Sequence, residues 1–362
     1  MKAPFSPYLD QITPYLRIIL SELEQDYSYV SILSTDSAGL AVRISQHAKS
    51  IGNRTMTTER GTVIRVYRDG LYSEFSLSDI RPDDIKGTVQ KIREDLERQF
   101  SLLKRTETRV FRTPELSDEP LELFFEKETG TLPEDADLEE LVASMVGISD
   151  KGMTMGDNIL DCSVTAQSTH ISKLFLSRNR FLSQSYVYSE GSVSAVVAEG
   201  DQNRVGYSSI SGLGGPEIFV QLGDKLETAV HSANELLHAE RLEPGEYVII
   251  TSPEVTGLIA HEAFGHGVEM DMFVKDRALG KHYIGKRVGS NLVTMHEGAL
   301  VADNVTSYVF DDEGTLAGDV TEISEGIAMA AVTPMMPMTS RVSIRVKPRL
   351  CFAFLRMCLT IF

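Results

Sequence analysis

Two histidines in the last third of the chain have the spacing and the neighbours to bind one metal ion. They lie in the run Ala-His-Glu-Ala-Phe-Gly-His-Gly, in which His261 and His266 are five residues apart and Glu262 follows the first. Imidazole is the commonest protein ligand of a catalytic metal ion. A carboxylate beside a metal-bound water is the usual general base of metal-assisted hydrolysis. We therefore predict a zinc site (Zn2+) with His261 and His266 as ligands and Glu262 as the catalytic base, without any organic cofactor.

The spacing of the histidines requires a distorted helix. In the familiar H-E-x-x-H pattern, the two histidines lie four residues apart and share one helix face. Here the interval is one residue longer, and at about 100° per residue a regular helix would turn the second ring roughly 140° away from the first. One extra residue, absorbed as a π-helical bulge, would bring the rings back together. We expect Gly265 to make this distortion easier.

The residues before the histidines predict a rigid support for the site. Pro244-Gly245 indicates a turn, and the run from 246 to 251 is typical of a strand. Ser252 then has the properties of a helix cap, Pro253 suits the first helical position, and Glu254 suits the positive end of the helix dipole. The predicted unit is a strand, a cap and a helix that carries His261.

The N-terminal part alternates between helix and strand signals. Apolar residues at intervals of three and four predict two helices, and β-rich runs around Asp69-Gly70 predict a hairpin. The predicted helices cover 15–23 and 85–103, and the predicted strands cover 29–34 and the hairpin 62–75.

The rest of the chain is predicted to contain mainly strands. The acidic, proline-containing run 113–140 is typical of a linker or exposed loop. Turn signals at 177–179, 199–201 and 311–314 separate the β-rich runs that follow. Helices are predicted at 138–146 and 226–237, and strands at 158–166, 172–177, 184–189, 192–199, 204–210, 296–305 and 306–310.

These elements predict an α+β fold with four parts. We expect an N-terminal α/β domain over 1–112, a strand-rich central domain over 113–222, and a β-rich domain over 223–327 that contains the metal-binding helix. The remaining tail covers 328–362.

The net charge and the cysteine content restrict the possible partners and the location of the protein. The chain has 362 residues, 42% of them hydrophobic and 24% charged, and a net charge of −17. This charge opposes a nucleic-acid partner, because phosphate binding needs clustered basic residues. Three scattered cysteines suit a reducing cytoplasm. No signal peptide and no apolar run long enough for a membrane span is evident, so we expect a cytoplasmic location and no membrane association.

The residues around the histidines resemble the signature of the TldD/PmbA family of metallopeptidases. The resemblance rests on Gly257 to Glu269, on the run Val-Phe-Asp-Asp-Glu-Gly over 309–314, and on the order of the predicted units. The PmbA (TldE) branch lacks the histidines, so the chain resembles the TldD branch. The resemblance implies a zinc-dependent peptidase that cleaves unfolded or short peptides in an enclosed cavity. It also implies a PmbA/TldE-like paralogue as partner, with a homo-oligomer as the alternative.

The tail departs from the family pattern. The last acidic residue is Glu325, and the 37 residues after it contain five basic ones, at 341, 345, 347, 349 and 356. We interpret the tail as the product of a truncation or frameshift after about residue 327, with a basic amphipathic tail as the alternative. The family's third ligand is a cysteine far downstream, whereas Cys351 and Cys358 have no recognisable ligand context.

The missing ligand leaves a second hypothesis open. A catalytic zinc ion usually has three protein ligands. Glu269 could act as a further ligand or as a partner of a ligand, and His282 and His296 could approach the site or lie on the surface. The alternative to an active peptidase is a catalytically impaired or non-catalytic peptide-binding subunit.

Overall fold

The computed structural model describes residues 1–330, except 56, 106–117, 270–271 and 274. The chain divides into two compact units. Unit 1 contains Met1–Ala239 and Ala302–Ala317, and unit 2 contains Glu240–Val301 and the chain from Gly318 onward. The mixed fold confirms the α+β prediction. The domain boundaries at 112, 222 and 327 stay a prediction.

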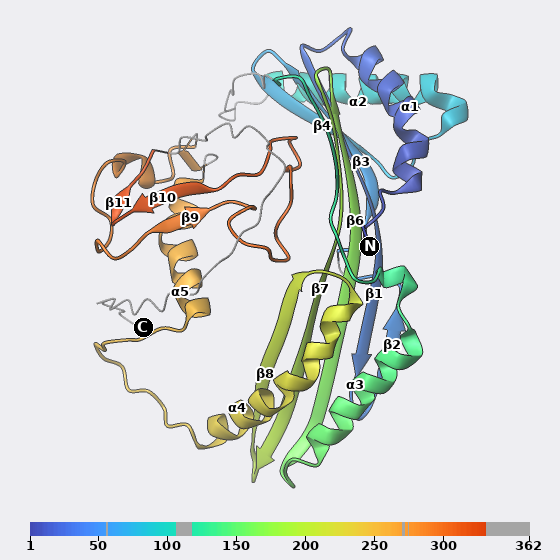
Figure 1. Ribbon diagram of the computed structural model, residues 1–362. Helices are drawn as coiled ribbons and strands as arrows, with labels where there is room; N and C mark the ends of the chain where they lie inside the picture. The colour runs from blue at the N-terminus through green and yellow to red at the C-terminus, as the bar shows by residue number, and fades with distance from the viewer. Residues whose placement is uncertain (56, 106–117, 270–271, 274, 331–362) are drawn as a thin grey trace. The chain divides into compact units, whose positions relative to one another are not determined.

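Unit 1 is built on one sheet of eight strands (Figure 1). The main order is β4-β3-β1-β6-β7-β5, with β2 paired to β1 and β8 paired to β7. Strand β5 is parallel to β7, and the other neighbours are antiparallel. The strands are β1 Tyr29–Ile44, β2 Lys49–Gly52, β3 Arg60–Arg68, β4 Leu71–Leu77, β5 Leu121–Glu126, β6 Ile159–Ser177, β7 Arg180–Glu199 and β8 Gln202–Leu213.

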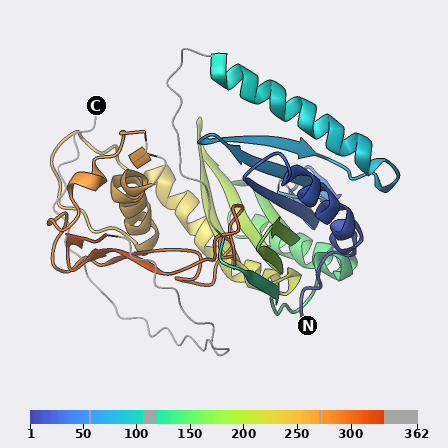
Figure 2. The ribbon, with the colours of Figure 1, turned by 90° about the horizontal axis from the view of Figure 1, so that it is seen from above.

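Helices cover one face of this sheet in two groups. The helices α1 (Pro7–Leu23) and α2 (Ile85–Arg105) bury their apolar stripes on one end of the sheet. The helices α3 (Leu138–Met153) and α4 (Leu226–His238), with the 3-10 segment Pro216–Lys225, cover the other end. Figure 2 looks along the strands from the end that α1 and α2 cover. Each group encloses a separate hydrophobic core.

Side-chain alternation assigns the strand residues to the two faces. On β1, the even-numbered residues Ile32 and Val42 are buried in the two cores under the helices. The odd-numbered residues therefore point to the opposite face. There Leu33 packs beside Phe175 in a small cluster, whereas Arg43 is exposed. One face of the sheet is thus covered by helices at both ends, and the second face has a mixed character.

Several predicted elements are confirmed. The hairpin turns at Asp69 and Gly70, with φ angles of 56° and 83°. The amphipathic stripe from residue 85 forms α2, and the stripe from residue 226 forms α4. The first helix, however, begins at Pro7 rather than residue 15, because Ser6 caps it and accepts a hydrogen bond from the Leu9 amide.

The five predicted strands between 158 and 210 are wrong in number, because they merge into β6, β7 and β8. The polar run 167–171, which separated the first two predicted strands, is mostly buried inside β6. Its side chains find partners on β7, since Ser189 donates to Ser168 at 2.8 Å and His170 contacts Ser185 at 3.0 Å. Hydrogen-bonded polar pairs can replace apolar alternation in a strand interior, and the apolar pattern alone does not detect them.

The linker prediction over 113–140 is also wrong in part, because Leu121–Glu126 forms strand β5. The strand predicted over 246–251 does not form, and the side chains of Val248 and Ile250 are 73% and 75% exposed there. A β-rich segment becomes a strand only where a neighbour supplies hydrogen-bond partners. Within the described residues, 246–251 has an isolated bridge at Ile249 in place of a ladder.

The two strands predicted between 296 and 310 are reduced to β9 (Met295–Glu297). Turn hydrogen bonds replace the ladder, as in the bond from Ser307 N to Asn304 O at 3.0 Å. Strand β9 pairs with β10 (Val320–Ser324), which was not predicted, and β10 pairs with β11 (Ile327–Ala328). None of the helices in the described part of the chain combines the length and apolar character that a membrane crossing requires.

The segment 302–317 returns to unit 1 and packs on the second face of the sheet. Phe310 is 1% exposed and lies in a cluster with Phe175 and Leu182. The buried Gln184 side chain donates to the Phe310 carbonyl and accepts from the Val309 amide, both at 2.8 Å. The predicted turn at 311–314 is confirmed, and Gly314 has a φ of 75° against the Phe175 ring.

We expect that Phe310→Ala lowers the free energy of unfolding by about 3–5 kcal/mol, because it empties a fully buried ring site. Phe124→Ala is the matched control, since Phe124 is 71% exposed and the same change should cost less than about 1 kcal/mol there. Urea unfolding of both full-length variants measures the difference. Equal losses would mean that segment 302–317 does not contribute to the core of unit 1.

Candidate metal centre

The two histidines lie on a helical segment of unit 2 that changes its winding at the site. Helix α5 (Pro253–Ala260) begins at Ser252, whose side chain caps the Val255 amide, as predicted. A π-helical turn follows from His261 to Gly265, and the short α6 (His266–Val268) completes the segment. The His266 amide donates to the His261 carbonyl, which is the five-residue hydrogen bond of a π-turn. The predicted distortion is confirmed.

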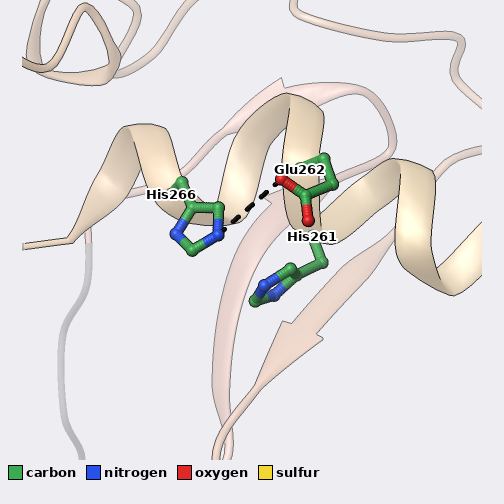
Figure 3. A group of neighbouring side chains, drawn as sticks. All are labelled: His261, Glu262 and His266. Carbon is green, nitrogen blue, oxygen red and sulfur yellow. Dashed lines mark ion pairs between the residues drawn. The ribbon is translucent and has the colours of Figure 1, made fainter.

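This turn brings the two imidazoles together (Figure 3). Their ring centroids lie 4.4 Å apart, with the ring planes inclined by 63°. One ligand atom from each of His261, Glu262 and His266 lies within 4.8 Å of the others. Glu262 Oε2 is 3.8 Å from His266 Nε2, which is the ion pair drawn in Figure 3. The three side chains therefore converge on one small volume of space.

The expected contribution of Gly265 is not seen in the backbone. Its φ of −52° and ψ of −55° lie in the right-handed helical region that any residue adopts. A Cβ atom there would meet His261 Nδ1 at 3.7 Å, an ordinary contact. The π-turn thus does not depend on glycine at this position.

Glu269 orients the second imidazole. Its Oε1 atom is 2.7 Å from His266 Nδ1, which donates to the carboxylate. This hydrogen bond raises the pKa of His266 above its ordinary value of 6.5, and the charge of Glu262 adds to the effect. When the ring is neutral and carries its proton on Nδ1, the lone pair of Nε2 lies on the side of Glu262. A carboxylate that holds a ligand histidine in this way is a common feature of metal sites.

The other candidate ligands lie elsewhere or outside the described residues. His296 Nδ1 is 2.8 Å from Asp319 Oδ1, and His282 is an exposed residue of a 3-10 turn. Within the described part of the chain, neither joins the cluster of His261, Glu262 and His266. Cys351 and Cys358 lie outside the described residues. Asp319, which the sequence did not single out, has no recognisable motif around it.

The donor atoms fit a zinc ion. Imidazole nitrogens and carboxylate oxygens are ligands that zinc prefers, and the hydrogen bond to Glu269 leaves Nε2 as the nitrogen through which a neutral His266 ring can bind a metal. The site is open, because the side chains of Glu262 and His266 are 62% and 49% exposed. Water and an extended substrate can therefore reach it.

The C-terminal part of the chain is similar to a domain of known metallopeptidases. Residues 244–333 match the family model for the C-terminal domain of PmbA/TldA metallopeptidases. A metalloprotease of Methanothermobacter thermautotrophicus is 29% identical over 137 residues, which is 37% of this chain and 30% of that protein. A zinc metalloprotease TldD homologue of Saccharolobus solfataricus is 32% identical over 90 residues, covering 25% of this chain and 20% of that protein.

A solved structure has the same fold. TldE from Thermococcus kodakarensis superimposes with a TM-score of 0.64 at 13% identity, over 87% of this chain and 69% of that chain. Over residues 244–333 the chain is thus similar to the C-terminal domain of the TldD/PmbA family, and the likeness to TldE is one of fold. Its match spans less than a third of the length of the curated relatives named above.

We expect that Glu269→Ala weakens the affinity for zinc by roughly ten- to a hundredfold, because His266 loses the partner that holds its ring. Glu254→Ala is the control, since that carboxylate lies near the start of α5 and contacts neither histidine. A competition titration with a chelating zinc dye measures both. An unchanged affinity in Glu269→Ala would show that the ring needs no carboxylate partner.

Proposed function

We propose that the chain is a zinc-dependent peptidase of the TldD branch, and that it hydrolyses peptide bonds of unfolded or short peptides. The observation that carries this proposal is the π-turn that places His261, Glu262 and His266 within 4.8 Å of one another. The match to a metallopeptidase domain over the same residues supports it. The TldD-like histidines favour this branch over the TldE branch.

The residues have separable roles in this chemistry. His261 and His266 would hold the ion, which when bound polarises a peptide carbonyl and acidifies water. Glu262 is adjacent in sequence to one ligand and 3.8 Å from the other, so its carboxylate can accept the proton of an attacking water. The same carboxylate can then return the proton to the leaving amine. Glu269 keeps His266 in the required tautomer.

The substrate and partner assignments extend this proposal. Because the site is exposed, an extended peptide can approach it, and pairing with a strand edge would give affinity without strong sequence demands. A PmbA/TldE-like paralogue or a second copy of the chain would enclose the site, and a cytoplasmic location would provide unfolded peptides. The net charge of −17 favours peptide over nucleic acid as the ligand.

A second candidate function is a non-catalytic peptide-binding subunit. It is favoured by the ligand count, since the cluster in the described part of the chain offers two imidazoles and the proposed base. Two ligands bind zinc much more weakly than three. The two functions differ in whether the purified chain retains zinc.

Replacing Glu262 by Gln should abolish peptidase activity while zinc binding persists, because the amide keeps the shape of the side chain but cannot accept a proton. Hydrolysis of a quenched fluorescent peptide, with zinc content measured in parallel, checks both parts. Glu254→Gln is the control and should keep full activity. Peptidase activity in the Glu262→Gln protein equal to that of the parent chain would rule out the role of base.

The metal content of the purified chain decides between the two functions. An active peptidase should carry about one zinc per chain, and His261→Ala and His266→Ala should each lose it. His296→Ala is the matched control, because His296 bonds to Asp319 and lies outside the cluster. Elemental analysis after dialysis gives the stoichiometry. A parent chain without zinc supports the non-catalytic subunit.

A further inference from the structure

The second face of the unit 1 sheet contains a groove of about 670 Å³. It crosses five adjacent strands, β2, β1, β6, β7 and β8, beside the end that α3 and α4 cover on the opposite face. Two cross-strand rows form its floor. They are Gly52, Ala41, Gln167, Glu190 and Ser211 in the first row, and Ser50, Arg43, Thr165, Ser192 and Ser209 in the second.

The floor offers hydrogen-bonding groups beside apolar ones such as Ile51. Four of the five residues in the second row are serine or threonine, and Thr165 and Ser192 contact each other through their hydroxyls at 2.7 Å. A hydroxyl can donate and accept, so such a row can bind the amide and carbonyl groups of a peptide main chain. Tyr207, 60% exposed, lines the groove from β8.

A cation without a partner lies on this floor. In the described sheet, every other arginine of a strand has a hydrogen-bond acceptor; these are Arg60, Arg65, Arg68, Arg180 and Arg204. The Arg43 side chain has no such acceptor among the described residues, although the chain carries 52 acidic residues. Its guanidinium is therefore available to a carboxylate of a ligand, which it can bind through two hydrogen bonds.

The groove also contains a carboxylate, that of Glu190, and its distance from Arg43 is one that a short extended peptide can span. Glu190 lies in the first row, where its carboxylate accepts a hydrogen bond from the Gln167 side chain. One strand, β6, separates it from Arg43, and the two rows are one two-residue step apart. The spacing between neighbouring strands and the rise per residue then place the Cα atoms of Arg43 and Glu190 about 12 Å apart. An extended chain covers about 3.3–3.6 Å per residue, so three or four residues span this distance.

We propose that this groove is a binding site for a short peptide with free ends. Arg43 binds its terminal carboxylate, Glu190 binds its terminal ammonium, and the hydroxyl row bonds to the main chain between them. The site belongs to unit 1 alone and is independent of the metal centre. Its ligand is defined by two terminal charges and the length between them, so sequence plays a small part in its recognition.

The test uses full-length protein carrying Glu262→Gln, so that the probes cannot be cleaved at the metal centre. Titration calorimetry measures the binding of tetra-alanine in three forms: with free ends, with an amidated C-terminus, and with an acetylated N-terminus. We expect amidation and Arg43→Gln each to weaken binding by about tenfold, as the loss of a charged hydrogen bond predicts. Applied together, they should weaken it no further, because they remove the same contact.

Acetylation of the peptide and Glu190→Gln should likewise each weaken binding by about tenfold. Applied together, they should weaken it no further, because both remove the contact between Glu190 and the terminal ammonium. Arg43→Lys should restore part of the affinity, since it keeps the charge and loses the two-fold hydrogen bonding. Arg81→Gln and Glu227→Gln are the controls, because both residues are exposed in unit 1 and lie outside the groove. Circular dichroism confirms that each variant is folded. Equal binding of all three peptide forms, no binding at all, or affinities that Arg43→Gln and Glu190→Gln leave unchanged would overturn the proposal.

Discussion

Side-chain alternation along the long strands β1, β6 and β7 determines most of unit 1. Because neighbouring residues point to opposite faces, one set packs under the helices and the other forms the second face. A slip of one residue between β6 and β7 would exchange these sets along the entire ladder. Buried polar pairs such as Ser168 with Ser189 oppose that slip, since each hydroxyl has its partner in only one register.

The second face of the sheet has different contacts along its length. At one end, Phe175 and Leu182 receive Phe310 from a distant part of the sequence. In the middle, the threonines at 55 and 57 contact Thr169 from a loop that crosses the strands. At the other end, the face is open and hydroxyl-rich. The sheet is therefore a scaffold on one side and a surface for both packing and binding on the other.

The candidate metal centre depends on a more local constraint. His261, Glu262 and His266 come from a single π-turn, which brings the centroids of the two rings to 4.4 Å from each other. Glu269 lies three residues after His266 and forms a hydrogen bond with the His266 ring. A site of this kind is encoded within nine residues, which explains why the spacing of the histidines was enough to predict the π-turn.

The sequence by itself determined the local features of the protein: the capped helix before His261, the π-turn, the hairpin at Asp69-Gly70 and the amphipathic helix α2. Each depends on residues within one or two turns of one another, where spacing specifies geometry. Only the tertiary structure decided that five predicted strands are three, that Leu121–Glu126 joins the sheet, and that residues 246–251 do not form a strand. Only the tertiary structure placed Arg43 and Glu190 on the floor of one groove. Those outcomes depend on which distant segment supplies the hydrogen-bond partner, and strand pairing carries no signal within the segment itself.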